Sequence, residues 1–228
     1  MSTITNKEIY LSNELIFSSG GNRICYHHPK HHDRCLKVLR PDRLPHQRRA
    51  AKHWLARLLP LSYYDENRVE YEALQYLHHT YSDTIRQHLP TSYGIKQTNH
   101  GWAHETTLVR DRDGLISQTL EQYIWENGLD QTAQDCIARF KKSWESETPN
   151  TRALIPHNMV IQRDDQDSCL ILIDGFGRKP SLSRVKSNTS NAGLYKRRIS
   201  DFDARIKKLI QRKAQNNGPT ERLENLMR

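Results

Sequence analysis

A few polar residues of this sequence have the types and the surroundings that phosphoryl transfer requires. Lys37 lies within the apolar stretch C-L-K-V-L, where an unpaired ammonium group would be costly to bury. Glu70 lies four and seven residues before Leu74 and Leu77, so it shares a helical stripe with two apolar side chains. Phosphoryl transfer depends mainly on positioning and on neutralising phosphate charge. A strand lysine paired with a helix glutamate is therefore a candidate for phosphate binding.

A second pair of polar residues lies beside two apolar runs in the second half of the chain. Asn158 directly precedes Met159-Val160-Ile161, and Asp174 follows the run that begins at Cys169. An amide oxygen and a carboxylate at strand edges are suitable ligands for Mg²⁺. Phosphoryl transfer also needs a group that accepts a proton from the nucleophile. The preceding residues T-R-A-L-I-P contain no acid, since Ala153 stands where one would be expected.

Length and composition restrict the class of protein. The 228 residues, 36% of them hydrophobic, are enough for one domain or for two small lobes with a compact core. No apolar stretch approaches the roughly 18–20 residues of a membrane span, and the N-terminus lacks a secretory pattern. The 4 cysteines do not form a disulfide framework, which favours a reducing compartment. We therefore expect a cytoplasmic protein without a membrane span.

The net charge of +9 raises the question of a nucleic-acid partner. The basic residues are scattered, with clusters at 43–57 and 184–213. Such clusters are more typical of solvated helix faces, although they also suit an acidic protein or a polyphosphate ligand. The charge pattern disfavours nucleic acid as the partner without excluding a basic binding module.

Hydrophobic periodicity and turn residues predict a strand-rich first half and a mostly helical second half. Strands are predicted near 15–17, 23–26, 35–39 and 102–109, with an extended stretch from Pro90 and a turn at R-D-R-D-G (110–114). Helices are predicted at 46–59, 65–79, 117–127, 130–147 and 193–214, and one hairpin at 158–162 and 169–173. This order indicates an α+β fold in two unequal lobes.

The order of these motifs resembles the protein kinase fold, and more narrowly the YrbL family of bacterial proteins associated with the PhoP regulatory network. The motifs cover about residues 15 to 178 and read G-G-N-R-I-C-Y-H-H-P, D-R-C-L-K-V, V-E-Y-E-A-L-Q-Y-L, V-R-D-R-D-G-L-I-S-Q-T-L, P-H-N-M-V-I and L-I-D-G-F-G. The resemblance implies a protein-kinase-like two-lobe fold with a truncated helical C-terminal lobe. The strand-rich N-lobe would span about 8–111, and the helical C-lobe with one β-hairpin about 112–228.

The resemblance also implies roles for individual residues, with ATP and magnesium as cofactors. Lys37 resembles the strand lysine that holds the inner phosphates, and Glu70 its helix partner, with Glu72 as the second choice. Asn158 and Asp174 resemble the two metal ligands. The triplet at 151–153 falls on the H-R-D motif of kinases, so that Arg152 matches the arginine and Ala153 replaces the catalytic base.

Several positions depart from the kinase pattern. Ser18, Gly20 and Arg23 fall on the three glycines of the phosphate-covering loop, which also contains Gly21. Arg23 is expected either to reach a phosphate itself or to be solvated. Cys25 and Cys35 fall where small apolar residues cover the adenine. The segment after Asp174 is too short for the usual peptide-docking lobe, which disfavours a protein substrate bound in the ordinary kinase manner.

Three other kinds of site have weaker support in the sequence. The stretch C-Y-H-H-P-K-H-H-D-R-C is rich in zinc-binding residue types, but it lacks the paired cysteine spacing of structural zinc sites. A hydrolase with a nucleophilic serine is not indicated, because no G-x-S-x-G motif is present. The turn at 110–114 lacks the remaining ligand spacing of a calcium loop.

These observations lead to one principal hypothesis and two alternatives. The principal hypothesis is a kinase-fold protein that binds ATP and magnesium in a regulatory role, with weak or no phosphotransfer. The first alternative is an active kinase for a small molecule or an envelope sugar. The second alternative is a basic binding module for an acidic protein or nucleic acid. The expected partners are a nucleotide and either a regulatory protein or a small-molecule substrate.

Overall fold

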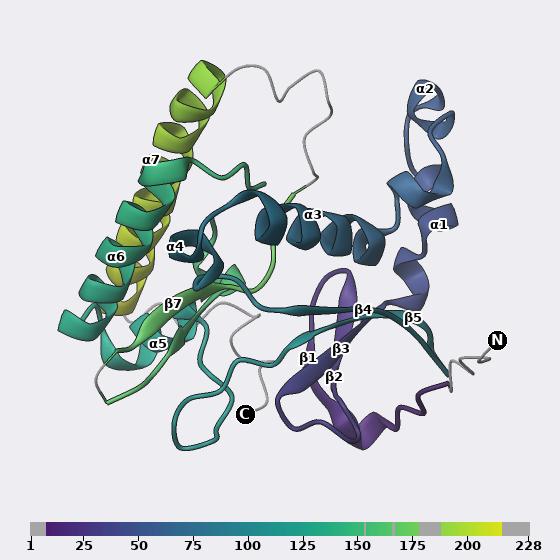
Figure 1. Ribbon diagram of the computed structural model, residues 1–228, viewed down its shortest axis with the longest axis horizontal. Coiled ribbons are helices and arrows are strands. Elements are labelled where there is room, and N and C mark those ends of the chain that lie inside the picture. The colour runs from purple at the N-terminus through teal and green to yellow at the C-terminus, as the bar shows by residue number, and fades with distance from the viewer. Residues whose placement is uncertain (1–7, 153, 166, 178–187, 216–228) are drawn as a thin grey trace. The chain divides into compact units, whose positions relative to one another are not determined.

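The computed structural model describes residues 8–152, 154–165, 167–177 and 188–215. These residues form two compact units, which are shown in Figure 1. The first unit contains the described residues up to Tyr71 together with Thr91–Leu108. The second unit contains Glu72–Pro90 and the described residues from Val109 onward. None of the helices in these ranges is both long enough and apolar enough to cross a membrane.

The first unit is built on a five-stranded antiparallel sheet with the strand order β1-β2-β3-β5-β4. The strands are β1 (Ile16–Ser19), β2 (Arg23–His27), β3 (Arg34–Leu39), β4 (Ser92–Thr98) and β5 (Gly101–Thr107). The predicted three-strand meander is confirmed, and so are the extended stretch after Pro90 and the strand that follows it. Short connections of three and six residues join β1 to β2 and β2 to β3, so turn residues in the sequence were sufficient to predict these strands.

The two faces of this sheet differ in chemistry because side chains alternate along each strand. In the register, Tyr26 lies opposite Leu36, and Val38 lies opposite Ala103. These side chains form an apolar core on one face together with Leu11. The other face carries the intervening residues of β2, β3 and β5, and we call it the polar face: Arg23, Cys25, Cys35, Lys37, His104 and Thr106.

The prediction of one helix over residues 46–59 was wrong. Two short helices are found instead, α1 (Pro45–Ala50) and α2 (Trp54–Arg57), followed by the 3₁₀ turn η3 (Leu61–Tyr63). The apolar stripe expected to face the core is exposed, since Trp54 and Leu58 are 63% and 77% accessible. A helix of this length is marginal in water unless it buries an apolar face, and the core of the first unit does not include this segment.

Helix α3 (Glu66–Thr80) was predicted to within one residue at each end. The Asp65 carboxylate accepts hydrogen bonds from the backbone N–H groups of Asn67 and Arg68, at 3.0 and 3.2 Å. This is the arrangement of an N-cap, which satisfies donors that the first helical turn leaves open. The cap fixes the start of the helix and thereby the position of Glu70 along it.

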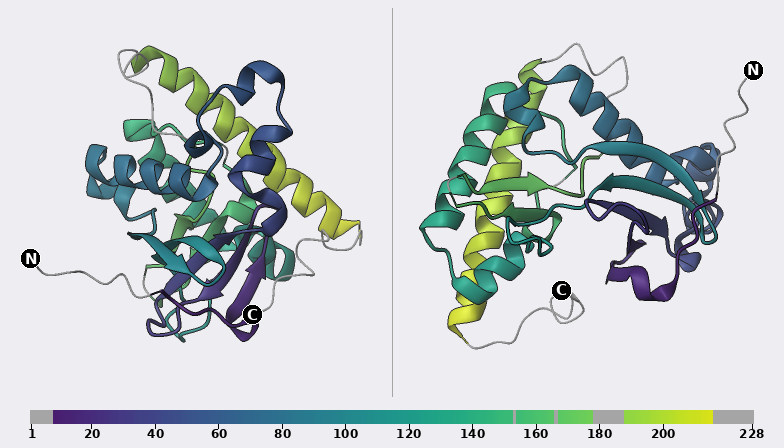
Figure 2. Two further views of the ribbon diagram at one scale, coloured as in Figure 1. Left: turned by 90° about the vertical axis from the view of Figure 1, so that its right-hand side faces the viewer. Right: turned by 60° about the horizontal axis from the view of Figure 1, so that its bottom comes forward.

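The second unit consists mainly of helices packed around one hairpin. Its helices are α4 (Asp83–Arg86), α5 (Leu120–Asn127), α6 (Gln131–Glu147) and α7 (Asn188–Ala214), and its strands are β6 (Met159–Gln162) and β7 (Cys169–Leu172). Both views in Figure 2 show α6 and α7 side by side. The core includes Phe140 and Trp144 of α6, Leu172 of β7 and Phe202 of α7. The predicted hairpin and the predicted helices of this half are present.

The chain thus has an α+β fold, as the sequence predicted. The two compact units do not follow the sequence order simply, because residues 72–90 cluster with the second unit. The sequence analysis had placed these residues in the strand-rich half. The more specific description as a kinase-like fold with two lobes stays a prediction at this point.

Candidate functional site

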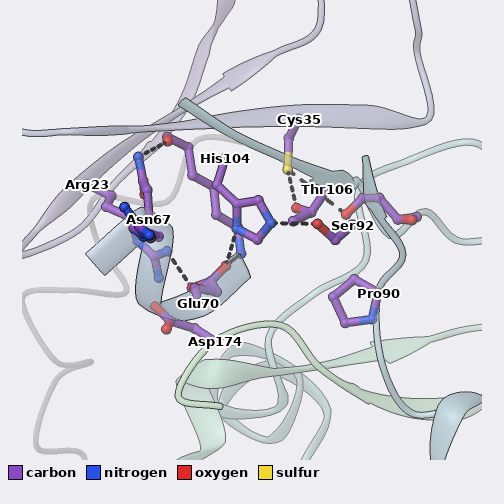
Figure 3. Close-up of polar contacts among 12 residues, drawn as sticks. Arg23, Cys35, Asn67, Glu70, Pro90, Ser92, His104, Thr106 and Asp174 are labelled. Carbon is purple, nitrogen blue, oxygen red and sulfur yellow. Dashed lines mark hydrogen bonds and ion pairs between the residues drawn. The ribbon is translucent and has the colours of Figure 1, made fainter. Parts of the chain in front are cut away.

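A charged cluster centred on Glu70 lies within the first unit (Figure 3). The Lys37 Nζ atom donates to Glu70 Oε1 at 2.6 Å, and the Arg23 guanidinium donates to Glu70 Oε2. Each of these three residues is less than a tenth exposed. The pairing of Lys37 with Glu70 that the sequence predicted is therefore present, and Arg23 adds a second buried cation to it.

The sheet register brings these side chains together. Lys37 lies opposite Cys25 on one neighbouring strand and opposite His104 on the other. Residues directly opposite in an antiparallel pair point to the same face, and Arg23 precedes Cys25 by two positions, which keeps it on that face. The polar face thus places Arg23, Lys37 and His104 within reach of one helix carboxylate.

The pKa of Glu70 is held well below its usual range. Burial alone would raise this pKa, but the positive charges of Arg23 and Lys37 outweigh burial and favour the carboxylate. Burial lowers the pKa of His104, although Glu70 opposes that effect. His104 is therefore neutral near pH 7, and the cluster of one carboxylate, one ammonium and one guanidinium carries a net positive charge.

Two residues that support this cluster were missed by the sequence analysis. His104 Nε2 lies 2.8 Å from Ser92 Oγ, and its Nδ1 lies 3.3 Å from Glu70 Oε1 without hydrogen-bond alignment. The Asn67 amide donates to the backbone carbonyls of Lys37 and Trp102, at 2.8 and 3.0 Å. Asn67 thus joins the first turn of α3 to β3 and β5. In the sequence, the position of Asn67 one helical turn before Glu70 was the only local indication that it belongs to this cluster.

The turn between β1 and β2 contains the predicted phosphate-covering residues. The backbone N–H of Gly20 donates to the carbonyl of Arg23 at 2.8 Å, which closes the turn. A Cβ atom added to Gly21 would meet no other atom within 4 Å. Packing within the described residues therefore does not require a glycine at position 21.

The two cysteines predicted near a base-binding surface both lie on the polar face. Cys35 is buried, and its Sγ lies 3.3 Å from Thr106 Oγ1. Burial raises the pKa of the Cys35 thiol, so it is protonated at neutral pH. Cys25 lies opposite Lys37 and is half-buried. Cys35 behaves as a small hydrophobic residue beside the charged cluster.

The predicted metal ligands lie at one end of the hairpin in the second unit. Asn158 directly precedes β6 and Asp174 follows β7 by two residues, and the strand ends Met159 and Leu172 are paired. The backbone N–H of Ile173 donates to the carbonyl of Asn158 at 2.8 Å, which extends the ladder by one step. The antiparallel pairing therefore brings Asn158 and Asp174 to neighbouring positions.

The segment of the predicted catalytic triplet is attached to the same end of the hairpin. The backbone N–H of Arg152 donates to the carbonyl of Gly175 at 2.9 Å, and the Arg152 side chain is exposed. A Cβ atom on Gly177 would lie 3.1 Å from the Arg152 nitrogen, and Gly177 has φ +81°. Ala153, which occupies the predicted base position, lies outside the described residues.

The chemistry of these donors suits magnesium better than zinc. Asn158 and Asp174 offer oxygen atoms, which magnesium prefers, and magnesium is usually held by one or two protein carboxylates plus phosphate oxygens and water. In the described ranges, no group of three or more histidine, cysteine or acidic side chains is arranged to hold a metal. A magnesium ion here would depend on a ligand to complete its coordination.

Comparison with solved structures gives several matches, and WbdD is one of them. The chain is similar to WbdD, known from a crystal structure at 2.2 Å, with a TM-score of 0.46 and 9% sequence identity. The match covers 86% of this chain and 44% of WbdD, so the chain spans less than half the length of that protein. None of the curated proteins compared with the chain gave a significant match.

The comparison with family models is more specific. The model described as PhoP regulatory network protein YrbL matches residues 9–209. This range contains the charged cluster around Glu70 and both predicted metal ligands. The chain therefore belongs to the YrbL family of PhoP regulatory network proteins.

Proposed function

We propose that this protein binds ATP with magnesium through a kinase-like fold and acts in regulation, with weak or no phosphotransfer. The observation that carries the proposal is the buried ion pair between Lys37 of β3 and Glu70 of α3. The antiparallel sheet, interrupted after β3 by the helix that supplies the glutamate, supports the kinase-like interpretation. Phosphoryl-transfer folds use such a pair to orient a lysine toward phosphate.

The charge of the cluster supports an anionic ligand. Glu70 supplies one negative charge, whereas Arg23 and Lys37 supply two positive charges on the polar face. Guanidinium and ammonium groups are the usual phosphate donors, so these two cations suit a phosphate ligand. Arg23 occupies the place of a loop glycine, so its phosphate contact would replace backbone contacts of a glycine-rich loop.

Magnesium would be held by Asn158 and Asp174 of the second unit. Both are oxygen donors at one end of the hairpin, and the ion would supply neutralisation of phosphate charge. Position 153 offers no proton acceptor, because alanine stands there. General-base catalysis is typically worth about 10²–10⁴-fold in rate. Nucleotide binding is therefore better supported by the residues than catalysis.

Direct binding of ATP, measured by calorimetry with and without Mg²⁺, tests the proposal. We expect binding by the parent protein and its loss in Lys37→Met. The matched control is Lys96→Met, because Lys96 belongs to the same sheet and also lies near a buried carboxylate, Glu105, at 3.5 Å. Lys96 is opposite Ala103 on the apolar face. Absence of ATP binding by the folded parent protein would end the proposal.

A separate variant tests whether Asp174 holds magnesium. Asp174→Asn should weaken the effect of Mg²⁺ on ATP binding, because one anionic ligand is lost. Asp165→Asn removes a carboxylate from the exposed turn of the same hairpin, where its side chain is 71% exposed. This control should bind ATP and Mg²⁺ like the parent, and an equal loss in both variants would contradict the assignment.

Turnover separates a regulatory protein from a working kinase. We expect little ATP hydrolysis or transfer by the parent, and an increase in Ala153→Asp. Strong parent turnover that Asp174→Asn abolishes would instead favour a kinase for a small molecule or an envelope sugar. If the chain binds nucleic acid rather than ATP, affinity must fall steeply as salt rises.

A further inference from the structure

A basic and apolar surface in the first unit is not explained by nucleotide binding. It is formed by residues 43–63, which include α1, α2 and η3, and we call it the 43–63 segment. Most of the exposed large hydrophobic side chains among the described residues lie in this segment: Trp54, Leu55, Leu58, Leu59, Leu61 and Tyr63. Exposed apolar groups concentrated in this way mark an interaction surface.

The exposed side chains belong to an ordered local structure. The Tyr64 hydroxyl donates to the carbonyl of Ala56, and Tyr64 itself is buried. The Arg57 Nε donates to the carbonyl of Lys52 at 2.8 Å, and Arg48 forms an ion pair with Glu66 at 2.5 Å. These contacts fix the path of the segment and hold its leucines and Trp54 toward solvent. Figure 1 shows α2 at the end of a projection that begins with α1.

The charge of the segment has one sign. It contains Arg43, Arg48, Arg49, Lys52 and Arg57 and no acidic residue. Within the part of the chain that the structure describes, Arg49, Lys52 and Arg57 have no carboxylate at ion-pair distance. Positive charge without internal compensation favours a negatively charged partner.

We infer that the 43–63 segment binds the surface of an anionic phospholipid membrane. Basic residues next to tryptophan and leucine are the composition of segments that lie in the interface of a bilayer, where tryptophan and tyrosine rings are favoured. Nearby arginines and lysines add attraction to anionic headgroups. The inference does not depend on nucleotide binding.

The geometry favours a lipid surface over a protein groove or nucleic acid. Recognition of a helix in a groove uses apolar anchors along two or more continuous turns, whereas α1 and α2 have 6 and 4 residues. Nucleic acid would use the arginines and lysines but would leave the leucines in water. A bilayer interface accepts both kinds of side chain without requiring a matching groove.

Co-sedimentation with lipid vesicles tests this inference. The parent protein should bind vesicles of phosphatidylcholine mixed with phosphatidylglycerol, and should bind pure phosphatidylcholine vesicles weakly. The variant Lys52→Glu/Arg57→Glu should lose at least about tenfold in affinity, because each basic residue near an anionic surface contributes roughly 1 kcal/mol. The variant Leu55→Ser/Leu58→Ser should lose affinity as well, although its charge is unchanged.

Matched controls distinguish this surface from general charge attraction. Arg205→Glu/Lys208→Glu makes the same change in net charge at exposed positions of α7, and Leu115→Ser removes an exposed leucine that is 57% accessible. Both controls should bind like the parent. Equal loss in the α7 variant would overturn the inference, and so would a failure of the parent to bind anionic vesicles at low salt.

Fluorescence quenching by brominated acyl chains gives an independent measurement. Quenching should be present in the parent and in Trp102→Phe, and should be strongly reduced in Trp54→Phe. If anionic vesicles do not bind and the parent instead self-associates through Leu55 and Leu58, the segment is an interface between copies and the lipid inference is wrong.

Discussion

Glu70 is the residue on which the charges of the first unit depend. Its carboxylate contacts Lys37 and Arg23, so replacement by glutamine would remove the buried negative charge that pairs with both cations. Breaking a buried ion pair by removing one partner costs about 3–5 kcal/mol. We expect Glu70→Gln to lower the free energy of unfolding by that amount, measured by hydrogen exchange of β3 and β5 amides. Lys37→Met should cost less, because Arg23 stays beside the carboxylate.

Glu66→Gln is the matched control for this prediction. Glu66 lies one turn earlier on α3 and pairs with Arg48, but both side chains are partly exposed, at 19% and 23%. Partly exposed ion pairs typically contribute about 0–1 kcal/mol. If Glu66→Gln and Glu70→Gln destabilise the sheet equally, the cluster around Glu70 has no special role in stability.

Two buried histidines, His88 and His104, should make the free energy of unfolding decrease in mild acid. Burial lowers the pKa of His88 from the usual value of 6.5, with opposition from the Leu170 carbonyl, and the pKa of His104 is lowered in the same way. As the pH falls through 6.5, the unfolded chain binds protons first, so the free energy of unfolding decreases. The depressed pKa of Glu70 adds a further loss only below its usual value of 4.5.

Urea denaturation at a series of pH values measures this effect in the second unit. The His88 ring lies 6.3 Å from that of Trp144, whose fluorescence reports on unfolding there. His88→Gln should be less stable at neutral pH but should show a weaker decline below about pH 6.5. Exposed His79→Gln should decline like the parent. An unchanged pH dependence in His88→Gln would contradict the prediction.

Residue types were sufficient to predict part of the candidate site. The other part depends on the register of the sheet, which the sequence did not reveal. Lys37 within an apolar run and Glu70 on a leucine stripe were sufficient to predict their pairing. His104 was not predictable, because it reaches Glu70 only through the pairing of β3 with β5, which are separated by more than sixty residues in sequence. Such long-range register leaves no local signal in the sequence.

At the scale of elements, the hairpin that carries Asn158 and Asp174 depends on one buried carboxylate. Asp111 accepts hydrogen bonds from the Ser117 hydroxyl at 2.6 Å, and from the backbone N–H and the Nε of Arg163 at 3.0 and 2.6 Å. Hydrogen bonds to charged groups contribute about 1.5–3 kcal/mol each. We expect Asp111→Ala to destabilise the hairpin by at least about 2 kcal/mol, seen as faster hydrogen exchange in β6.

A control for this prediction lies at the tip of the same hairpin. Asp165 pairs with Arg112, and both side chains are more than 60% exposed. Asp165→Ala should change hydrogen exchange in β6 very little, since exposed pairs contribute about 0–1 kcal/mol. The calcium-loop alternative for residues 110–114 also fails here, because Asp111 accepts from protein donors and the segment closes as a turn at Gly114.

The error over residues 46–59 shows where helical periodicity is insufficient. Trp54, Leu55, Leu58 and Leu59 have the spacing of a buried stripe, yet all are exposed. Periodicity indicates which side chains would share a face, but not whether a core exists to receive that face. The same exposed residues supply the apolar part of the membrane surface proposed above.

At the scale of the whole molecule, the α+β class and the order of elements followed from alternating and helical patterns. The strand order β3-β5-β4 and the grouping of residues 72–90 with the second unit did not. Both depend on which apolar surfaces bury each other across long stretches of chain. Local propensity does not encode that choice.

The two units have separate hydrophobic cores, so each unit should respond separately to the loss of a core side chain. Leu36 is fully buried in the core of the first unit, and Leu172 is fully buried in the core of the second. Truncating a buried leucine to alanine costs about 2–5 kcal/mol. Leu36→Ala should accelerate exchange of the amides in β2 and β3, and Leu172→Ala that of the amides in β6 and α6. Each variant should leave the slowest-exchanging amides of the other core nearly unchanged. If either substitution accelerates both sets equally, the cores unfold as one cooperative unit and the assignment of separate cores is wrong.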